Sequence, residues 1–338
     1  MRRPPGRRGH VVIALLLVEL RRGFARRVIR GLFALAVLNF AVAGVIVFIV
    51  TDSDAEVAAK QAAADRVVRD CLAGTTYPPG SEFDPFAGPV EERFPDVPAF
   101  TAPDVGTAER EQFCADRGRE QPGEVRRFAV TSYRDVSEAL NGLLTLLALV
   151  IGATMIGAEW GAKTLATHLT WEPRRALLYA AKALAALLVA VTFYFFSQAL
   201  ELAALAPAAS AHGAGSAPPG FWSDWLGLVV RGAGTIGVMA GVGFAIASVT
   251  QSTVFALVFI FLLSIVDGIG ILVWHDLYRW SLFRNIGAFQ SGRGLEPFDF
   301  GSFFVAGRSA GSAGLLIMTY ALVLLAGGTA VFRRRDIN

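Results

Sequence analysis

Six stretches of this sequence are long and apolar enough to cross a lipid bilayer, which leaves room for few other fold classes. A helix needs roughly 20 mostly apolar residues to cross a hydrocarbon core of about 30 Å. The whole chain is 54% hydrophobic and only 17% charged, so lipid is its expected solvent. We therefore expect an all-α polytopic membrane protein. The predicted spans are 31–50, 138–158, 176–206, 223–249, 252–274 and 312–332.

The placement of arginine predicts the orientation of these spans. Nine arginines precede the first span, and three more, Arg333 to Arg335, follow the last. Because basic residues next to a span are retained in the cytoplasm, we expect both termini there, together with the turn 159–175 and the tail 333–338. The scarcity of lysine beside arginine indicates an actinobacterial source, and so a multi-pass protein of a bacterial plasma membrane.

The segment before the first span, residues 1–30, has two different faces. An apolar row runs from Ile13 to Val28 at helical spacing, while Arg22, Arg26 and Arg30 share another face. This pattern predicts an amphipathic helix at the membrane interface. Its arginines can serve simply as positive-inside anchors, or the helix can also rest on a cytoplasmic partner.

Three polar segments, 51–137, 207–222 and 275–311, then fall on the outer side. The first is acidic and rich in proline, and we expect a small extracytoplasmic subdomain there. Its two cysteines, Cys71 and Cys114, can oxidise outside the cell, and closing this loop would stabilise the subdomain by about 4 kcal/mol. Two free or buried thiols are the alternative. The four histidines are scattered, so no metal site is expected.

The turn at 159–175 is the most informative of the polar segments. One span ends at its start, a short amphipathic helix follows over about 163–171, and a proline and two arginines open the next span. Such a hairpin can enter a groove on a soluble partner and pass the partner's motion to two spans. An ordinary loop with interfacial tryptophans is the alternative. The predicted coupling residues are Glu159, Trp160, Lys163, Thr164, Leu165, Thr170, Trp171, Pro173, Arg174 and Arg175.

The same segment resembles the ABC-2 type transporter permeases. Those proteins have a glutamate at the end of the second span, a Gly-Thr-Leu-like helix start, a Leu-Thr pair, a proline with arginines, and a lysine early in the third span. Lys163 departs from the pattern, since many members have glycine there. The ending 332–337 is also similar to theirs. The matching positions, in order, are Glu159, Thr164-Leu165, Leu169-Thr170, Pro173-Arg174-Arg175 and Lys182.

This resemblance implies a permease subunit, an exporter, that dimerises and is driven by a separate cytoplasmic ABC ATPase bound through the hairpin. The chain has no G-x-x-x-x-G-K-[ST] motif, so ATP and Mg would be bound by that partner and no cofactor or catalytic residue is expected here. The other expected partners are a second permease copy and lipid, but not nucleic acid. The alternative function is a membrane-anchored sensor or immunity protein that binds ligands through 51–137.

Three charged residues fall inside predicted spans. A charge at mid-span costs at least ~2.5 kcal/mol on insertion scales, which makes each one a functional candidate. Arg231 and Asp267 lie at similar depths, about 10 Å from the outer ends of spans four and five. We expect them to form a structural salt bridge or to face a hydrated vestibule. Glu201, near the outer end of span three, is expected to be interfacial.

Overall fold

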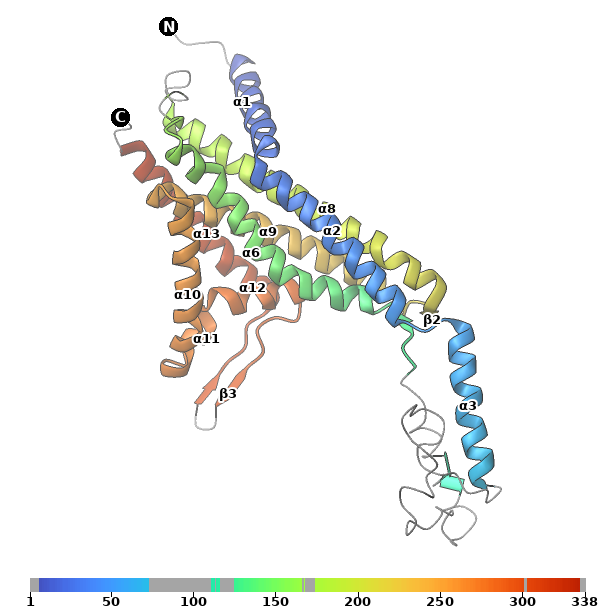
Figure 1. The fold of residues 1–338 in the computed structure, drawn as a ribbon. Helices are drawn as coiled ribbons and strands as arrows, with labels where there is room; N and C mark the ends of the chain where they lie inside the picture. The colour runs from blue at the N-terminus through green and yellow to red at the C-terminus, as the bar shows by residue number, and fades with distance from the viewer. Residues whose placement is uncertain are drawn as a thin grey trace, which may run out of the picture. The chain divides into compact units, whose positions relative to one another are not determined.

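A computed structural model describes residues 6–72, 111–112, 114–115, 125–165, 167, 174–300 and 303–334. In this part of the chain, six helices are long and apolar enough to cross a membrane, which confirms the predicted all-α polytopic fold. Figure 1 shows them in chain order from blue to red. They are α2 (Arg27–Val50), α6 (Ser132–Gly161), α8 (Arg175–His212), α9 (Phe221–Thr250), α10 (Thr253–Val273) and α13 (Ala310–Arg334).

The chain divides into two compact units. Unit 1 comprises 1–45, 130–206 and 216–338, and therefore holds most of the spans. Unit 2 comprises 46–129 and 207–215, which covers most of the predicted extracytoplasmic subdomain. The third span does not end at 206 as a helix, because α8 continues through Pro207 as far as His212.

The core of unit 1 is the contact between α6 and α9. The two backbones touch at two glycines, where a Cβ on Gly152 would overlap the carbonyl of Ala240 and a Cβ on Gly243 would overlap that of Leu149. Small residues allow this approach, which is how helices gain packing contacts in lipid. As a result, α9 is the most buried of the six spans.

A further helix, α1 (Gly6–Ala25), precedes the first span. Arg26 is the single non-helical residue between α1 and α2. Leu16, Leu20 and Phe24 of α1 pack against the core of unit 1. An amphipathic helix was expected here; of its apolar row, Leu20 and Phe24 meet the bundle, whereas Ile13, Leu17 and Val28 are exposed.

The segment 275–311 was expected to be a simple external loop, but most of it is folded. It contains α11 (Leu277–Trp280), α12 (Leu282–Ser291) and an antiparallel hairpin of β3 (Phe298–Phe300) and β4 (Phe303–Val305). The short helix α12 packs against α6, α9 and α13. Its inner side is polar as well as apolar, because Asn285 and Gln290 are both buried.

Unit 2 contains α3 (Asp54–Leu72) and a two-residue parallel pair of β1 (Phe128–Ala129) and β2 (Gly213–Ala214). Cys71 and Cys114 form a disulfide. At the start of α3, Lys60 Nζ lies 2.7 Å from Asp52 Oδ2, and the backbone N–H of Arg126 donates to the same oxygen at 2.8 Å. The Arg126 contact joins the start of the 51–137 segment to its later part.

Candidate functional site

The first polar site of unit 1 is a buried group of charges that we call the ionic cluster, made of Glu19, Arg26, Glu159 and Lys182. Lys182 is 1% exposed, and its Nζ lies 2.8 Å from Glu19 Oε2 and 2.8 Å from Glu159 Oε2. Arg26 Nη2 lies 2.8 Å from Glu159 Oε1. Two acids thus meet two bases, as a buried ion group requires if its desolvation cost is to be offset.

The ionic cluster joins three helices. Glu19 comes from α1, Glu159 from the last turn of α6, and Lys182 from the second turn of α8. Arg26, in the break between α1 and α2, also donates to the carbonyls of Thr154 (2.7 Å) and Met155 (3.0 Å) on α6. A displacement of α1 or of the α6 end is therefore carried to α8 by short, buried, charge-assisted contacts.

The structure places Glu159 inside the ionic cluster and away from the surface of the turn. We expected its carboxylate to meet a soluble partner, but Glu159 is 6% exposed and is bound by Lys182 and Arg26. Trp160 also turns inward, where its ring packs edge to face on Phe332, and Leu165 is fully buried. A charge at the end of a span takes an internal partner when one is near, and Lys182 supplies it.

Other predicted coupling residues lie at the surface. Lys163, Thr164 and Arg174 are exposed, and Arg175 is half-buried at the start of α8. Lys163 has φ = 54°, a left-handed conformation that glycine adopts without steric cost, which is a physical reason for glycine at this position in the permeases that the segment resembles. The remaining predicted residues, Thr170, Trp171 and Pro173, lie outside the described residues.

A second polar site, the Glu201 cluster, lies between α6, α8 and α9 and consists of Ser137, Asn141, Tyr194, Gln198, Glu201 and Trp225. Ser137 Oγ lies 2.8 Å from Glu201 Oε1 and 3.3 Å from Gln198 Oε1, and it accepts from Trp225 Nε1 at 3.0 Å. One turn along, Tyr194 OH donates to Asn141 Oδ1 at 3.0 Å.

Glu201 was expected to lie at the membrane interface, and in the structure its side chain is fully buried within unit 1. Its helix turns this side toward Ser137, where the hydroxyl has only one proton to offer to two acceptors. Within the described residues, Glu201 Oε2, Gln198 Nε2 and Asn141 Nδ2 have no hydrogen-bond partner. The cluster therefore has spare polar capacity, and no salt bridge to Glu201 is present in the described part of the chain.

The predicted pair of Arg231 and Asp267 is not formed. Arg231 donates to the carbonyls of Gln290 (3.2 Å) and Ser291 (3.5 Å), at the last turn of α12. Asp267 Oδ2 accepts from Ser281 Oγ at 2.5 Å, and Ser281 is the N-cap of α12. Each charge holds one end of α12, with the basic residue at the helix C-terminus where it complements the helix dipole.

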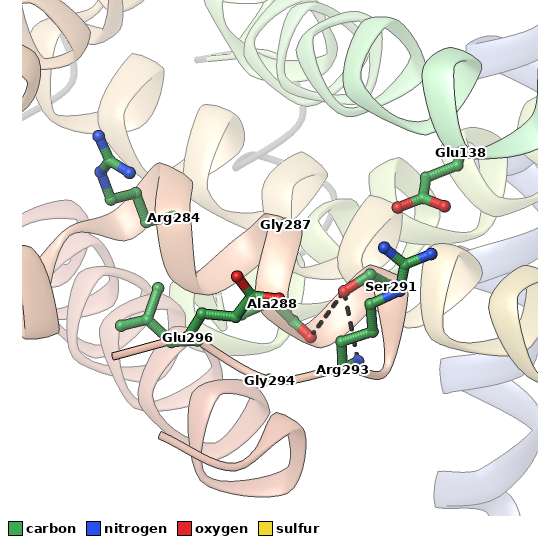
Figure 2. Close-up of a pocket in the computed structure, with 9 residues that line it drawn as sticks. Glu138, Arg284, Gly287, Ala288, Ser291, Arg293, Gly294 and Glu296 are labelled. Carbon is green, nitrogen blue, oxygen red and sulfur yellow. Dashed lines mark hydrogen bonds between the residues drawn. The ribbon is translucent and has the colours of Figure 1, made fainter. Parts of the chain in front are cut away.

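A pocket of about 350 Å³ opens beside α12. Figure 2 shows Arg293 extending toward Glu138 of α6, while Arg284 lies on the other side of the pocket. Glu296 also lines it. Two acids and two bases around a small space suit a polar ligand that carries charge. None of these residues was predicted from the sequence.

Fold and site together define a class of protein: a polytopic α-helical membrane protein whose spans are locked together by buried charges at one end. The family model described as ABC-2 family transporter protein matches residues 13–337, almost the whole chain. The chain therefore belongs to this family, and it is a membrane permease subunit of an ABC transporter. Comparison with curated proteins and with solved structures gave no match.

Proposed function

We propose that this permease is the membrane half of an exporter, and that a separate cytoplasmic ATPase drives it through the end of unit 1 that holds the ionic cluster. The ATPase would bind ATP and Mg, and two permease copies would form the transport path. Export and dimerisation rest on the resemblance to ABC-2 permeases. The contact with the motor rests in addition on the geometry of this chain.

The observation that carries the proposal is the ionic cluster. A motor that pushes on the turn after α6 must move more than one span if it is to change access to a path across the membrane. Glu159 lies two residues before the end of α6 and is joined to α8 through Lys182 and to the α1–α2 break through Arg26. A push at this turn is thus distributed over three spans at once.

The surface that would meet the motor is the exposed part of the same turn, at Lys163, Thr164 and Thr167. The buried residues Glu159 and Lys182 would transmit the motion but would not touch the partner. Substitutions at the exposed residues should therefore affect binding of the ATPase, whereas substitutions at the buried residues should also disturb folding.

The test is recovery of the ATPase with tagged permease from the native host. Lys163→Glu, which reverses a charge at the exposed turn, should abolish co-purification while the permease still elutes as a folded species. Arg279→Glu is the matched control, since it makes the same charge change on the exposed part of α11. Permease that is purified folded but carries no ATPase, with or without the substitution, would contradict the proposal and favour a sensor or immunity protein.

A further inference from the structure

An apolar groove of about 630 Å³ runs between α8 and α13, and residues of α9 form its floor. It extends along α8 from Tyr179 to Val191 and along α13 from Met318 to Thr329. Gly234, Gly237 and Gly241 lie in the floor together with Ala233 and Val238, so the floor is built mostly of small residues. The walls include Leu184, Leu187, Met318, Leu322 and Leu325.

The length of the groove matches one leaflet of a bilayer. Tyr179 and Val191 are twelve residues apart on one helix, which at 1.5 Å per residue is about 18 Å. Half of a hydrocarbon core of about 30 Å is about 15 Å. A single extended acyl chain of one leaflet would therefore lie in the groove along most of its length.

A hydrocarbon chain is narrower than a transmembrane helix, which is about 10 Å wide with its side chains. A groove of about 630 Å³ that is mostly apolar suits such a chain. A helix of a second copy is the competing occupant, and disulfide cross-linking between copies distinguishes the two.

One end of the groove is strongly basic. Arg175 precedes Tyr179 by four residues on α8, and Arg333 follows Thr329 by four on α13, so each arginine continues the face that lines the groove. Arg175 Nη1 donates to the carbonyl of Arg333 at 3.5 Å, which brings the two helix ends together. In sequence, Arg174, Arg175 and Arg333 to Arg335 outnumber the two nearby acids, Glu172 and Asp336.

We propose that this groove binds an anionic phospholipid, with one acyl chain between α8 and α13 and the phosphate on the arginines at the helix ends. Basic pockets between spans recognise anionic headgroups through charge, and the apolar groove would hold the attached chain. The lipid would complete the surface where α8 and α13 are separated. This inference does not depend on the direction of transport or on the motor.

The experiment uses the full chain in vesicles containing phosphatidylglycerol or phosphatidylcholine with a photoactivatable acyl chain. Phosphatidylglycerol should label 179–191 and 318–329 about tenfold more than phosphatidylcholine does. Removing two arginines by Arg333→Gln with Arg334→Gln should lower this labelling about tenfold, to the level of phosphatidylcholine, since each arginine near an anionic headgroup contributes up to roughly a factor of five. The control is Arg27→Gln with Arg30→Gln, two exposed arginines at the start of α2, which should leave the labelling unchanged.

A second variant, Ala183→Phe, places a large side chain in the groove and should exclude the acyl chain of either lipid. Equal labelling of these segments by the two lipids in the unsubstituted protein would overturn the proposal, as would an equal loss in the control pair. Disulfide cross-linking of Ala183→Cys between two copies would overturn it too, because a helix would then occupy the groove.

Discussion

The ionic cluster and the Glu201 cluster are both buried in unit 1, and they differ in how their acids are satisfied. In the ionic cluster, Lys182 and Arg26 lie within 3 Å of carboxylate oxygens. In the Glu201 cluster, a carboxyl that is just as buried receives one hydrogen bond from Ser137. Charge balance fixes the first cluster as a rigid joint, whereas the second is held together by hydroxyl and amide groups.

Lys182→Met gives the largest expected effect. It removes the cation between Glu19 and Glu159 and leaves two buried acids facing each other beside Arg26. Breaking a buried ion group from one side costs about 3–5 kcal/mol. We expect loss of the folded peak in size-exclusion chromatography in detergent. Lys163→Met is the matched control, because Lys163 is exposed, and should retain the peak. Equal recovery of the two variants would show that the ionic cluster is not a structural joint.

The two clusters can be compared directly by making the same glutamate-to-glutamine change in each. Glu159→Gln keeps the shape of the side chain but removes the charge that Lys182 and Arg26 face, so it should cost about 2 kcal/mol or more in unfolding free energy. Glu201→Gln also keeps the shape and removes no charge from a cation in the described residues, so it should cost less than about 1 kcal/mol.

Denaturant titration of both variants in the same detergent measures this difference. The comparison fails if Glu201→Gln is as destabilising as Glu159→Gln. That result would show that the Glu201 carboxylate contributes as much to stability as one that is paired with cations.

The partly buried ion pair of Lys60 and Asp52 in unit 2 gives the smallest expected effect in the comparison. The hydrogen bond from Lys60, followed by that from the Arg126 backbone, lowers the pKa of Asp52 below its ordinary value of 3.8. The folded pKa is depressed, so this contribution is present above pH 4 and is lost as the pH falls through the lowered folded value. Asp52→Asn should make the stability of unit 2 less dependent on pH between 5 and 3.

Hydrogen exchange of α3 at these two pH values measures the effect. Asp65→Asn, on the exposed side of the same helix, is the control and should keep the pH dependence of the unsubstituted protein. If Asp52→Asn left the pH dependence unchanged, the ionisation of Asp52 would not contribute to the stability of unit 2. The effect should be the smallest of the three because solvent screens the pair.

The coupling segment shows which features of the site could be predicted from a local sequence pattern and which could not. Glu159 and Lys182 both belong to the motif that resembles ABC-2 permeases, so their importance could be predicted from sequence. Their contact with each other could not, because it requires α6 and α8 to turn particular faces inward and α1 to supply Glu19. The buried position of α12 could not be predicted from sequence either, because a polar segment that follows a span is normally exposed.

Sequence by itself determined the six spans and the family, because the length and apolarity of a span and the order of motif residues are local properties of the chain. Only the tertiary structure decided the partners of the charges. Arg231 and Asp267 have matching depths, yet α12 folds back so that each holds one of its ends. Glu201 lies near the end of a predicted span, yet its helix continues past that point and buries it. Depth along a helix can be read from sequence, but the direction a side chain faces depends on packing against its neighbours.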